Sequence, residues 1–318
     1  VPPVGPPLLW FAAMLTLVFS GFSFLTIVFY DQGVLTADRL QGQGHLRLAR
    51  WRETGALLGV CVAAIAPVGL GVWMQTPFAG FAAGFAVLAL LAVMMMRREW
   101  SGVGLPASTG LRAVLRDGLA RRLLLIALLN AAPVAVTSTL FLFFVDARLD
   151  EGGKEGPLLL LFFLAAACAA PVWGILAERH GPKPVLLAAM ALSILSLGGA
   201  VFLGAGDWLW FAVICLASGA ALGADLTLLP AIFAARMAQI SPGATDGFGL
   251  WSFVSKFTLA FAAVTLLPAL QSAGFDSTGD SPASALTLLA VLYALVPCGL
   301  KLFAMGLLIA TPIREALS

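Results

Sequence analysis

Three ionisable side chains stand inside long apolar stretches of the chain, namely Asp225, Lys256 and Lys301. A charge at the centre of a lipid bilayer costs about 2.5 to 3.5 kcal/mol on insertion scales, so such residues usually face a cavity or a partner. At a rise of 1.5 Å per residue, Asp225 and Lys256 both lie about 10 Å inside their stretches, and Asn130 reaches the same level. A polar cluster at one depth, contributed by three helices, predicts a central binding site.

The same charges allow a second interpretation. An ion pair between Asp225 and Lys256 whose only role is to lock two helices together is the alternative to a binding site. Lys301 lies nine residues from the end of its apolar stretch. We expect its long side chain to extend along the helix and reach the membrane surface.

Apolar residues dominate the composition. Of 318 residues, 61% are hydrophobic and 11% are charged, whereas about 25% are charged in a soluble domain. A soluble fold is therefore excluded, and a net charge of +2 provides no basic surface for nucleic acid. Because a spanning helix needs about 20 apolar residues, we expect an all-α, polytopic membrane protein with nine spans. These are residues 8–30, 54–75, 77–96, 123–145, 157–177, 184–204, 208–232, 249–270 and 284–310.

Basic residues fall in alternate breaks between these spans. Fourteen of the 18 Lys and Arg residues lie in one set of breaks, and only Arg148 and Lys154 lie in the other. The positive-inside rule places the larger set in the cytoplasm. We therefore expect an integral protein of the bacterial inner membrane whose chain begins outside and ends inside.

The longest break, residues 97–122, is basic and rich in glycine. It predicts a cytoplasmic linker between a partial bundle at 1–96 and a six-helix bundle at 123–318. Many transporters consist of two six-helix halves, each built from two three-helix repeats. Because three spans precede the linker and six follow it, we expect three further spans before Val1.

A short motif lies between the fifth and sixth expected spans. It reads G-x-x-x-E-R-x-G-x-K and consists of Gly174, Glu178, Arg179, Gly181 and Lys183. It resembles the inter-helix signature of the major facilitator superfamily, although an ordinary basic loop is the alternative. We expect a tight turn at Gly181, with Glu178 accepting hydrogen bonds from a neighbouring helix end or an arginine.

Four segments resemble the glycoside-pentoside-hexuronide:cation symporter family of that superfamily. They are LRLARWRETGALLGV at 46–60, LLNAAPVAVTSTLFLFFVDARL at 128–149, LGADLTLLPAIFAA at 222–235 and FGLWSFVSKFTLAFAAV at 248–264. The resemblance covers essentially the whole chain. It implies the major facilitator fold without its first three helices, so that the nine spans are helices four to twelve.

The resemblance also implies roles for single residues. Lys256 matches an eleventh-helix lysine in the family's sugar and cation region, and Arg52 matches a fifth-helix arginine that contacts sugar. Thr26 matches a fourth-helix threonine near the cation site. Three residues later the family has an acidic residue, whereas this chain has Phe29, and Asp31 is the nearest acid.

Together these observations predict a secondary active transporter rather than an enzyme, since the chain has no motif of a nucleotide-driven pump or a membrane hydrolase. We expect alternating access with a small polar solute, most simply a sugar, coupled to H⁺ or Na⁺, and no other cofactor. The expected solute-binding residues are Arg52, Asn130, Asp225 and Lys256. A monomer in contact with membrane lipid is expected. A lipid or lysolipid carrier on the same fold and a non-transporting scaffold or sensor are the alternatives.

Overall fold

The computed structural model describes residues 7–37, 40, 43–100, 110–240, 245–276 and 281–313, and these are helical with short connections. The long helices are α1 (Pro7–Ala37), α2 (Gly44–Gly71), α3 (Pro77–Trp100), α5 (Gly118–Phe143), α6 (Glu155–His180), α7 (Pro182–Gly199), α8 (Trp208–Ile240), α9 (Thr245–Ser272) and α10 (Ala283–Ile309). The short elements are α4 (Leu111–Arg116), the π-helical turn η1 (Phe144–Arg148) and the 3₁₀ turn η2 (Ala200–Phe202). An apolar chain in lipid must pair its own backbone polar groups, which explains why every long element is a helix.

Nine helices of the described residues are long and apolar enough to cross a membrane, which confirms the all-α, polytopic prediction. The helices are longer than the expected spans. The predicted break at 31–53 is mostly helical, because α1 continues to Ala37 and α2 begins at Gly44. Asp31 and Arg52 therefore lie on helices rather than in a loop. Residues 101–109 of the predicted linker lie outside the described residues.

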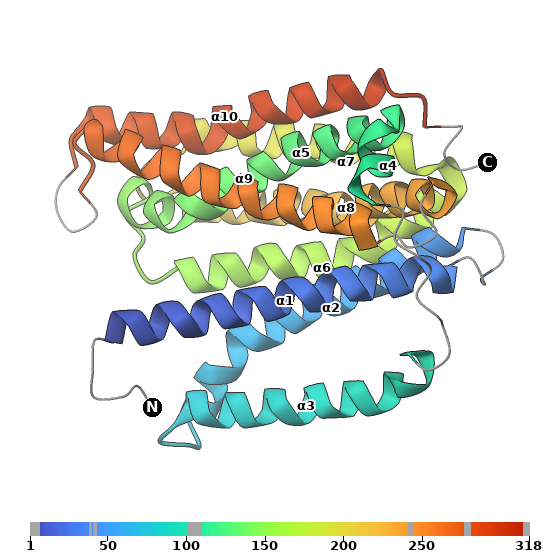
Figure 1. Cartoon of the computed structure of the whole chain (residues 1–318). Coiled ribbons are helices and arrows are strands. Elements are labelled where there is room, and N and C mark those ends of the chain that lie inside the picture. Colours follow the sequence, from blue (N-terminus) through green and yellow to red (C-terminus); the bar gives the residue numbers. More distant parts are fainter. Residues whose placement is uncertain are drawn as a thin grey trace.

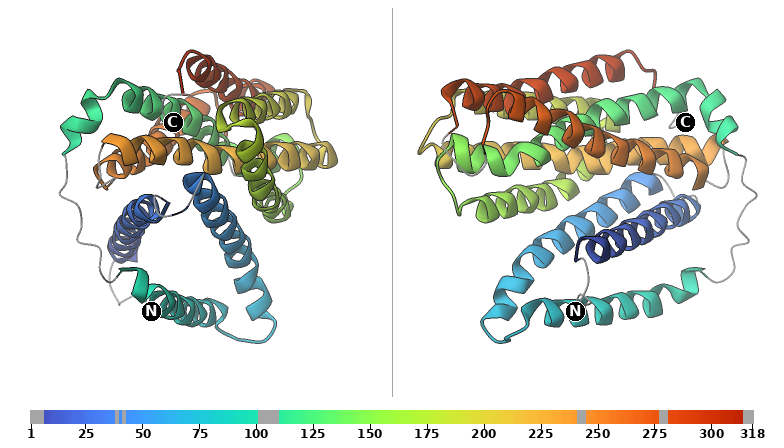
Figure 2. Two further views of the ribbon diagram at one scale, coloured as in Figure 1. Left: turned by 90° about the vertical axis from the view of Figure 1, so that its right-hand side faces the viewer. Right: turned by 60° about the vertical axis from the view of Figure 1, so that its left-hand side comes forward.

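Helices α5 to α10 form one bundle in which α8 is the central element. It packs against α6 and α7, while α5 packs against α9 and α10. Figure 1 shows these helices side by side, with α1 and α2 along one side of the bundle and α3 farthest from it. The two views in Figure 2 agree with this placement of the first three helices. Helix α2 contacts α6 and α8, whereas α3 packs mainly against α2.

One end of the molecule carries most of the described loop cations, and we call it the basic end, defined by Arg50, Arg116, Lys183 and Arg236. Here Asp117 caps the start of α5 by accepting a hydrogen bond from the backbone N–H of Ala120 at 2.7 Å. Such caps satisfy N–H groups that the first helical turn leaves unpaired. The opposite end contains the short connections η1–α6 and η2–α8.

Candidate functional site

Helices α1, α5, α8 and α9 surround a cavity of about 550 Å³, which we call the central cavity. Most of its wall is apolar, with the aromatic residues Phe19, Phe22 and Trp251 among its lining. Its polar lining includes Thr26, Tyr30, Asn130, Asp225, Ser252 and Lys256. The structure therefore brings together Asn130, Asp225 and Lys256, the three residues that the sequence placed at one depth.

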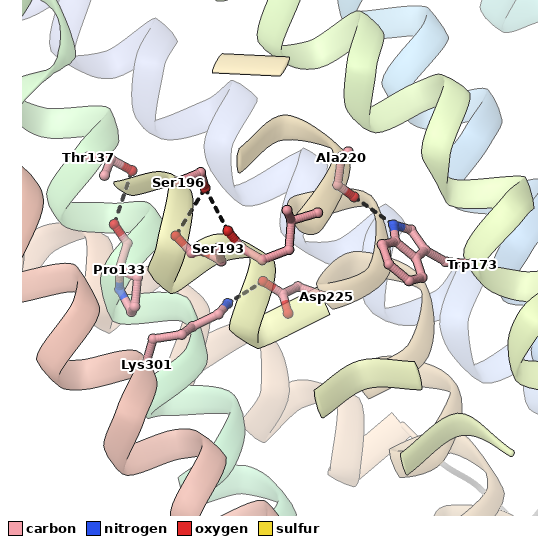
Figure 3. A network of polar contacts seen from close by, with 9 residues as sticks. Pro133, Thr137, Trp173, Ser193, Ser196, Ala220, Asp225 and Lys301 are labelled. Carbon is pink, nitrogen blue, oxygen red and sulfur yellow. Dashed lines mark hydrogen bonds and ion pairs between the residues drawn. The ribbon is translucent and has the colours of Figure 1, made fainter. Parts of the chain in front are cut away.

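Asp225 has a different partner from the one that the sequence favoured. Its Oδ2 accepts a hydrogen bond from Lys301 Nζ, and this ion pair links α8 to α10 (Figure 3). Lys301 is 1% exposed, so the prediction that it reaches the membrane surface is wrong. The reason is that Asp225 lies inside the bundle within reach of the Lys301 side chain. For the buried ammonium, this contact replaces water.

Lys256 lies in the wall of the central cavity and does not pair with Asp225, which corrects the second interpretation offered above. Its ammonium donates a hydrogen bond to Ser23 Oγ on α1 and lies 5.3 Å from the centre of the Phe19 ring. The Ser23 hydroxyl in turn donates to the carbonyl oxygen of Phe19 at 2.6 Å. The Lys256 side chain is half-buried, so its charge is held by polar and aromatic contacts.

Two buried acceptors in the same wall lack a hydrogen-bond donor within the described part of the chain. They are Asn130 Oδ1 and Asp225 Oδ1, on residues that are 5% and 6% exposed. A buried polar atom without a partner is rare in a folded protein and costs about 1 to 3 kcal/mol. These two oxygens are suited to accept hydrogen bonds from a ligand, and Lys256 is suited to donate one.

A second, smaller cavity lies within the bundle of α5 to α10 and has a volume of about 260 Å³. We call it the inner cavity. Its polar lining consists mainly of Thr137, Ser193, Ser218, Tyr293, Asp225 and Lys301. The two cavities share Val134, Ser138, Leu222 and Asp225, so Asp225 stands in the wall between them.

Arg52 reaches the central cavity only through Tyr30. Its guanidinium lies 3.6 Å from the centre of the Tyr30 ring, and its Nε donates to Glu53 Oε1 at 2.8 Å. The Tyr30 hydroxyl donates to the same Glu53 oxygen at 3.0 Å. Arg52 therefore orients a residue of the wall and is not itself among the lining residues.

The two predicted cation-site residues occupy different environments. Thr26 lines the central cavity, and its hydroxyl donates to the carbonyl oxygen of Phe22 at 2.7 Å. Asp31 is 4% exposed, lines neither cavity, and has no donor for its Oδ1 among the described residues. The structure therefore separates Asp31 from the three residues at the cavity wall.

The predicted turn motif lies at the basic end and adopts the expected geometry. Helix α6 ends at His180, Gly181 has a φ of +87°, and α7 starts at Pro182. Arg50 of α2 forms an ion pair with Glu178 at 3.2 Å. A Cβ on Gly174 would lie 2.7 Å from Arg50 Cδ, so the glycine makes room for this arginine.

The last residue of the motif fixes a different helix. Lys183 donates hydrogen bonds to the carbonyl oxygens of Ile309 and Thr311, at 2.9 and 2.8 Å. These are unpaired carbonyl groups at the end of α10, where a cation is favourable. Arg179 is exposed. The motif therefore joins α2 to α6 and α7 to α10 at one end of the molecule.

Sequence reasoning missed Tyr30, Glu53 and Ser23, and it misplaced Lys301. Glu53 could have been found, because it is an acid at the edge of an apolar stretch and is 8% exposed in the structure. Ser23 and Tyr30 carry no such signal. Their roles depend on which face of α1 meets α2 and α9, and the hydropathy of a uniformly apolar helix does not show this.

Comparison with known proteins adds two findings. The profile of the family described as MFS/sugar transport protein matches residues 1–315. The chain is also similar in structure to the protein described as "Crystal structure of a bacterial homologue of iron transporter ferroportin in outward-facing state". That similarity has a TM-score of 0.63 at 15% identity, covering 88% of this chain and 67% of the other. No curated protein matches the sequence.

Proposed function

Because the chain belongs to the MFS/sugar transport protein family, and is thus an integral membrane protein of a transporter family, we propose that it carries a small polar solute of the sugar class by cation-coupled symport. The solute binds in the central cavity, and the two bundles, 1–96 and 123–318, rock about it around the linker at 97–122. The coupling ion is H⁺ or Na⁺. The protein acts as a monomer in the bacterial inner membrane, with its basic end in the cytoplasm.

The observation that carries this proposal is the set of unsatisfied polar groups at the cavity wall. Asn130 Oδ1 and Asp225 Oδ1 need donors, and sugar hydroxyls supply them. The Lys256 ammonium supplies the opposite polarity by donating to a hydroxyl oxygen. The volume of about 550 Å³ lies within the range of about 300 to 1,000 Å³ typical of small-molecule sites. Trp251 and Phe22 add apolar faces against which the C–H face of a sugar ring packs.

The test is direct binding of a panel of radiolabelled monosaccharides and disaccharides to the purified full chain in lipid vesicles. We expect at least one sugar to bind, and we expect Asn130→Leu and Lys256→Met each to weaken its binding about tenfold or more, because each removes a hydrogen bond at a buried site. Thr265→Val and Lys154→Met are matched controls, since neither residue lines either cavity. They should leave binding unchanged.

Two results would contradict the proposal. One is a panel in which no sugar binds while a radiolabelled lysophospholipid does, which would favour the lipid carrier. The other is sugar binding that survives in both the Asn130→Leu and Lys256→Met variants at wild-type strength. Circular dichroism of each variant distinguishes lost binding from lost folding.

A further inference from the structure

The carboxylate of Asp225 stands where the central and inner cavities meet (Figure 3). Among the described residues, it is the one charged side chain that lines both cavities. Lys256 lines only the central cavity, and Lys301 lines only the inner one. One acid therefore lies between two cations that reach it from opposite sides of the same wall.

The two oxygens of this carboxylate have different surroundings. Oδ2 accepts the hydrogen bond of Lys301, while Oδ1 is buried and has no donor in the described part of the molecule. Buried polar groups that serve only to fix a structure normally have all their hydrogen bonds made. An open lone pair on a carboxylate that lines a cavity is instead a site for a hydrogen bond from a ligand or for a proton.

We propose that Asp225 takes up and releases the coupling proton of the transport cycle, an inference that rests on the function proposed above. In the uptake step a proton from water in the central cavity forms an O–H bond with Oδ1. The net charge of the Asp225–Lys301 pair then changes from zero to +1. The hydrogen bond from Lys301 weakens, because a neutral carboxyl group is a poorer acceptor than a carboxylate. In the release step the proton returns to water and the ion pair forms again.

The inner cavity explains how Lys301 tolerates both steps. The hydroxyl groups of Thr137, Ser193, Ser218 and Tyr293 line it, and each hydroxyl oxygen can accept a hydrogen bond. The Lys301 ammonium therefore has other acceptors in the same cavity when the Asp225 carboxyl is neutral. A cavity lined only by hydrocarbon would leave the ammonium without a partner in that state.

The titratable groups around Asp225 are few. Helix α1 contributes Tyr30, α8 contributes Cys215, α9 contributes Lys256, and α10 contributes Tyr293 and Lys301. Helices α5, α6 and α7 line the cavities with no titratable side chain, and the charged residues of α2 and α4 line neither cavity. Asp225 is thus the one acid that lines these cavities in the described ranges. A proton that enters either cavity meets no other carboxylate there.

The test is an infrared titration of the full chain in lipid vesicles, with the proton as the probe and no solute added. On acidification we expect the C=O stretch of a protonated carboxyl group to appear in the wild type and to be absent in Asp225→Asn. The Asp207→Asn variant should keep the band, because Asp207 lies in the η2–α8 connection and lines neither cavity. In Lys301→Gln the band should persist to higher pH, by about one pH unit or more, since the cation that stabilises the carboxylate is gone. Lys154→Gln is the control for that change.

Three outcomes would overturn the proposal. They are a wild type in which no band depends on Asp225, a Lys301→Gln variant that titrates like the wild type, and a band that Na⁺ removes at constant pH. If Asp225→Asn does not fold, the doubly neutral Asp225→Leu, Lys301→Met variant is the reference, and a band that persists in it has the same meaning. Sugar binding to the Asn130 and Lys256 variants is measured separately, so failure here leaves the solute proposal standing.

Discussion

The first three helices and the last six are similarly apolar, yet they use their apolar surfaces differently. In their most apolar windows, α1 and α3 have no buried residues, whereas 61% of the α8 window is buried. Lipid tails are as apolar as leucine, so hydropathy alone does not drive one helix in a membrane against another. The comparison shows that hydropathy marks the helices that enter the membrane and that other features decide which of them pack together.

Small residues are one such feature, and the chain offers a matched pair of them. Gly219 and Gly223 on α8 have the same spacing as Gly80 and Gly84 on α3. A Cβ on Gly223 would lie 2.6 Å from the carbonyl oxygen of Ala166 on α6, and a Cβ on Gly219 would be even closer to the backbone of Phe162. Around Gly84, nothing lies within 4 Å of an added Cβ. The same motif therefore brings two helices together in one region and not in the other.

The largest effect that we predict uses this pair. Gly223→Ala should lower the free energy of unfolding by about 1 to 3 kcal/mol, because the new methyl group meets a backbone carbonyl that cannot move without separating α6 from α8. Gly84→Ala should leave stability unchanged or raise it by up to about 1 kcal/mol, since alanine favours a helix more than glycine does. Chemical unfolding in detergent, followed by circular dichroism, measures both. Equal losses in the two variants would break the comparison between the regions.

The contact between the two regions gives a smaller prediction. Arg50 on α2 and Glu178 on α6 form an ion pair with side chains that are 14% and 30% exposed. In a double-mutant cycle with Arg50→Met and Glu178→Gln, we expect a coupling energy of about 1 kcal/mol, because the pair is only partly screened by water. The Lys154 and Glu151 pair is the control, since its side chains are 36% and 21% exposed. A coupling energy at Arg50 no larger than that of the control would mean that α2 is held by packing alone.

The spans could be predicted from the sequence because lipid permits one solution. An apolar stretch of about 20 residues in a bilayer has to form a helix. The helix ends could not be predicted in the same way. Arg50 and Arg52 interrupt the apolar pattern, yet both lie within α2, since a helix continues past the hydrocarbon into the polar layer. The family was also predicted correctly, because several short segments occur in the family's order.

The site was predicted in depth but not in direction. Counting residues placed Asn130, Asp225 and Lys256 at one level, and the structure brings all three to one cavity. Counting could not show that Asp225 pairs with Lys301, because that depends on the rotation of α8 and α10 about their own axes. A helix that is apolar on every side gives no moment from which to read this rotation.

The smallest effect that we predict depends on pH and lies at the basic end, within the six-helix region. Arg236 on α8 donates to both carboxylate oxygens of Asp117 at the start of α5, with Nε 3.1 Å from Oδ1. This hydrogen-bonded pair holds the pKa of Asp117 below its ordinary value, and the backbone N–H groups of the α5 start lower it further, although partial burial opposes both.

The sign of the pH effect follows from that direction. A carboxyl whose pKa is lower in the folded than in the unfolded protein stabilises the fold above its unfolded pKa of about 3.9, and this contribution disappears as the pH falls through the folded pKa. Asn caps a helix as well as Asp does but carries no charge. Asp117→Asn should therefore cost less than about 1 kcal/mol at neutral pH, and the gap to the wild type should close in acid. Thermal unfolding of both proteins over a series of pH values measures this gap. A gap that stays constant down to strong acid would show that Asp117 acts as a helix cap alone and that the charge of Arg236 adds nothing to the stability of the six-helix region.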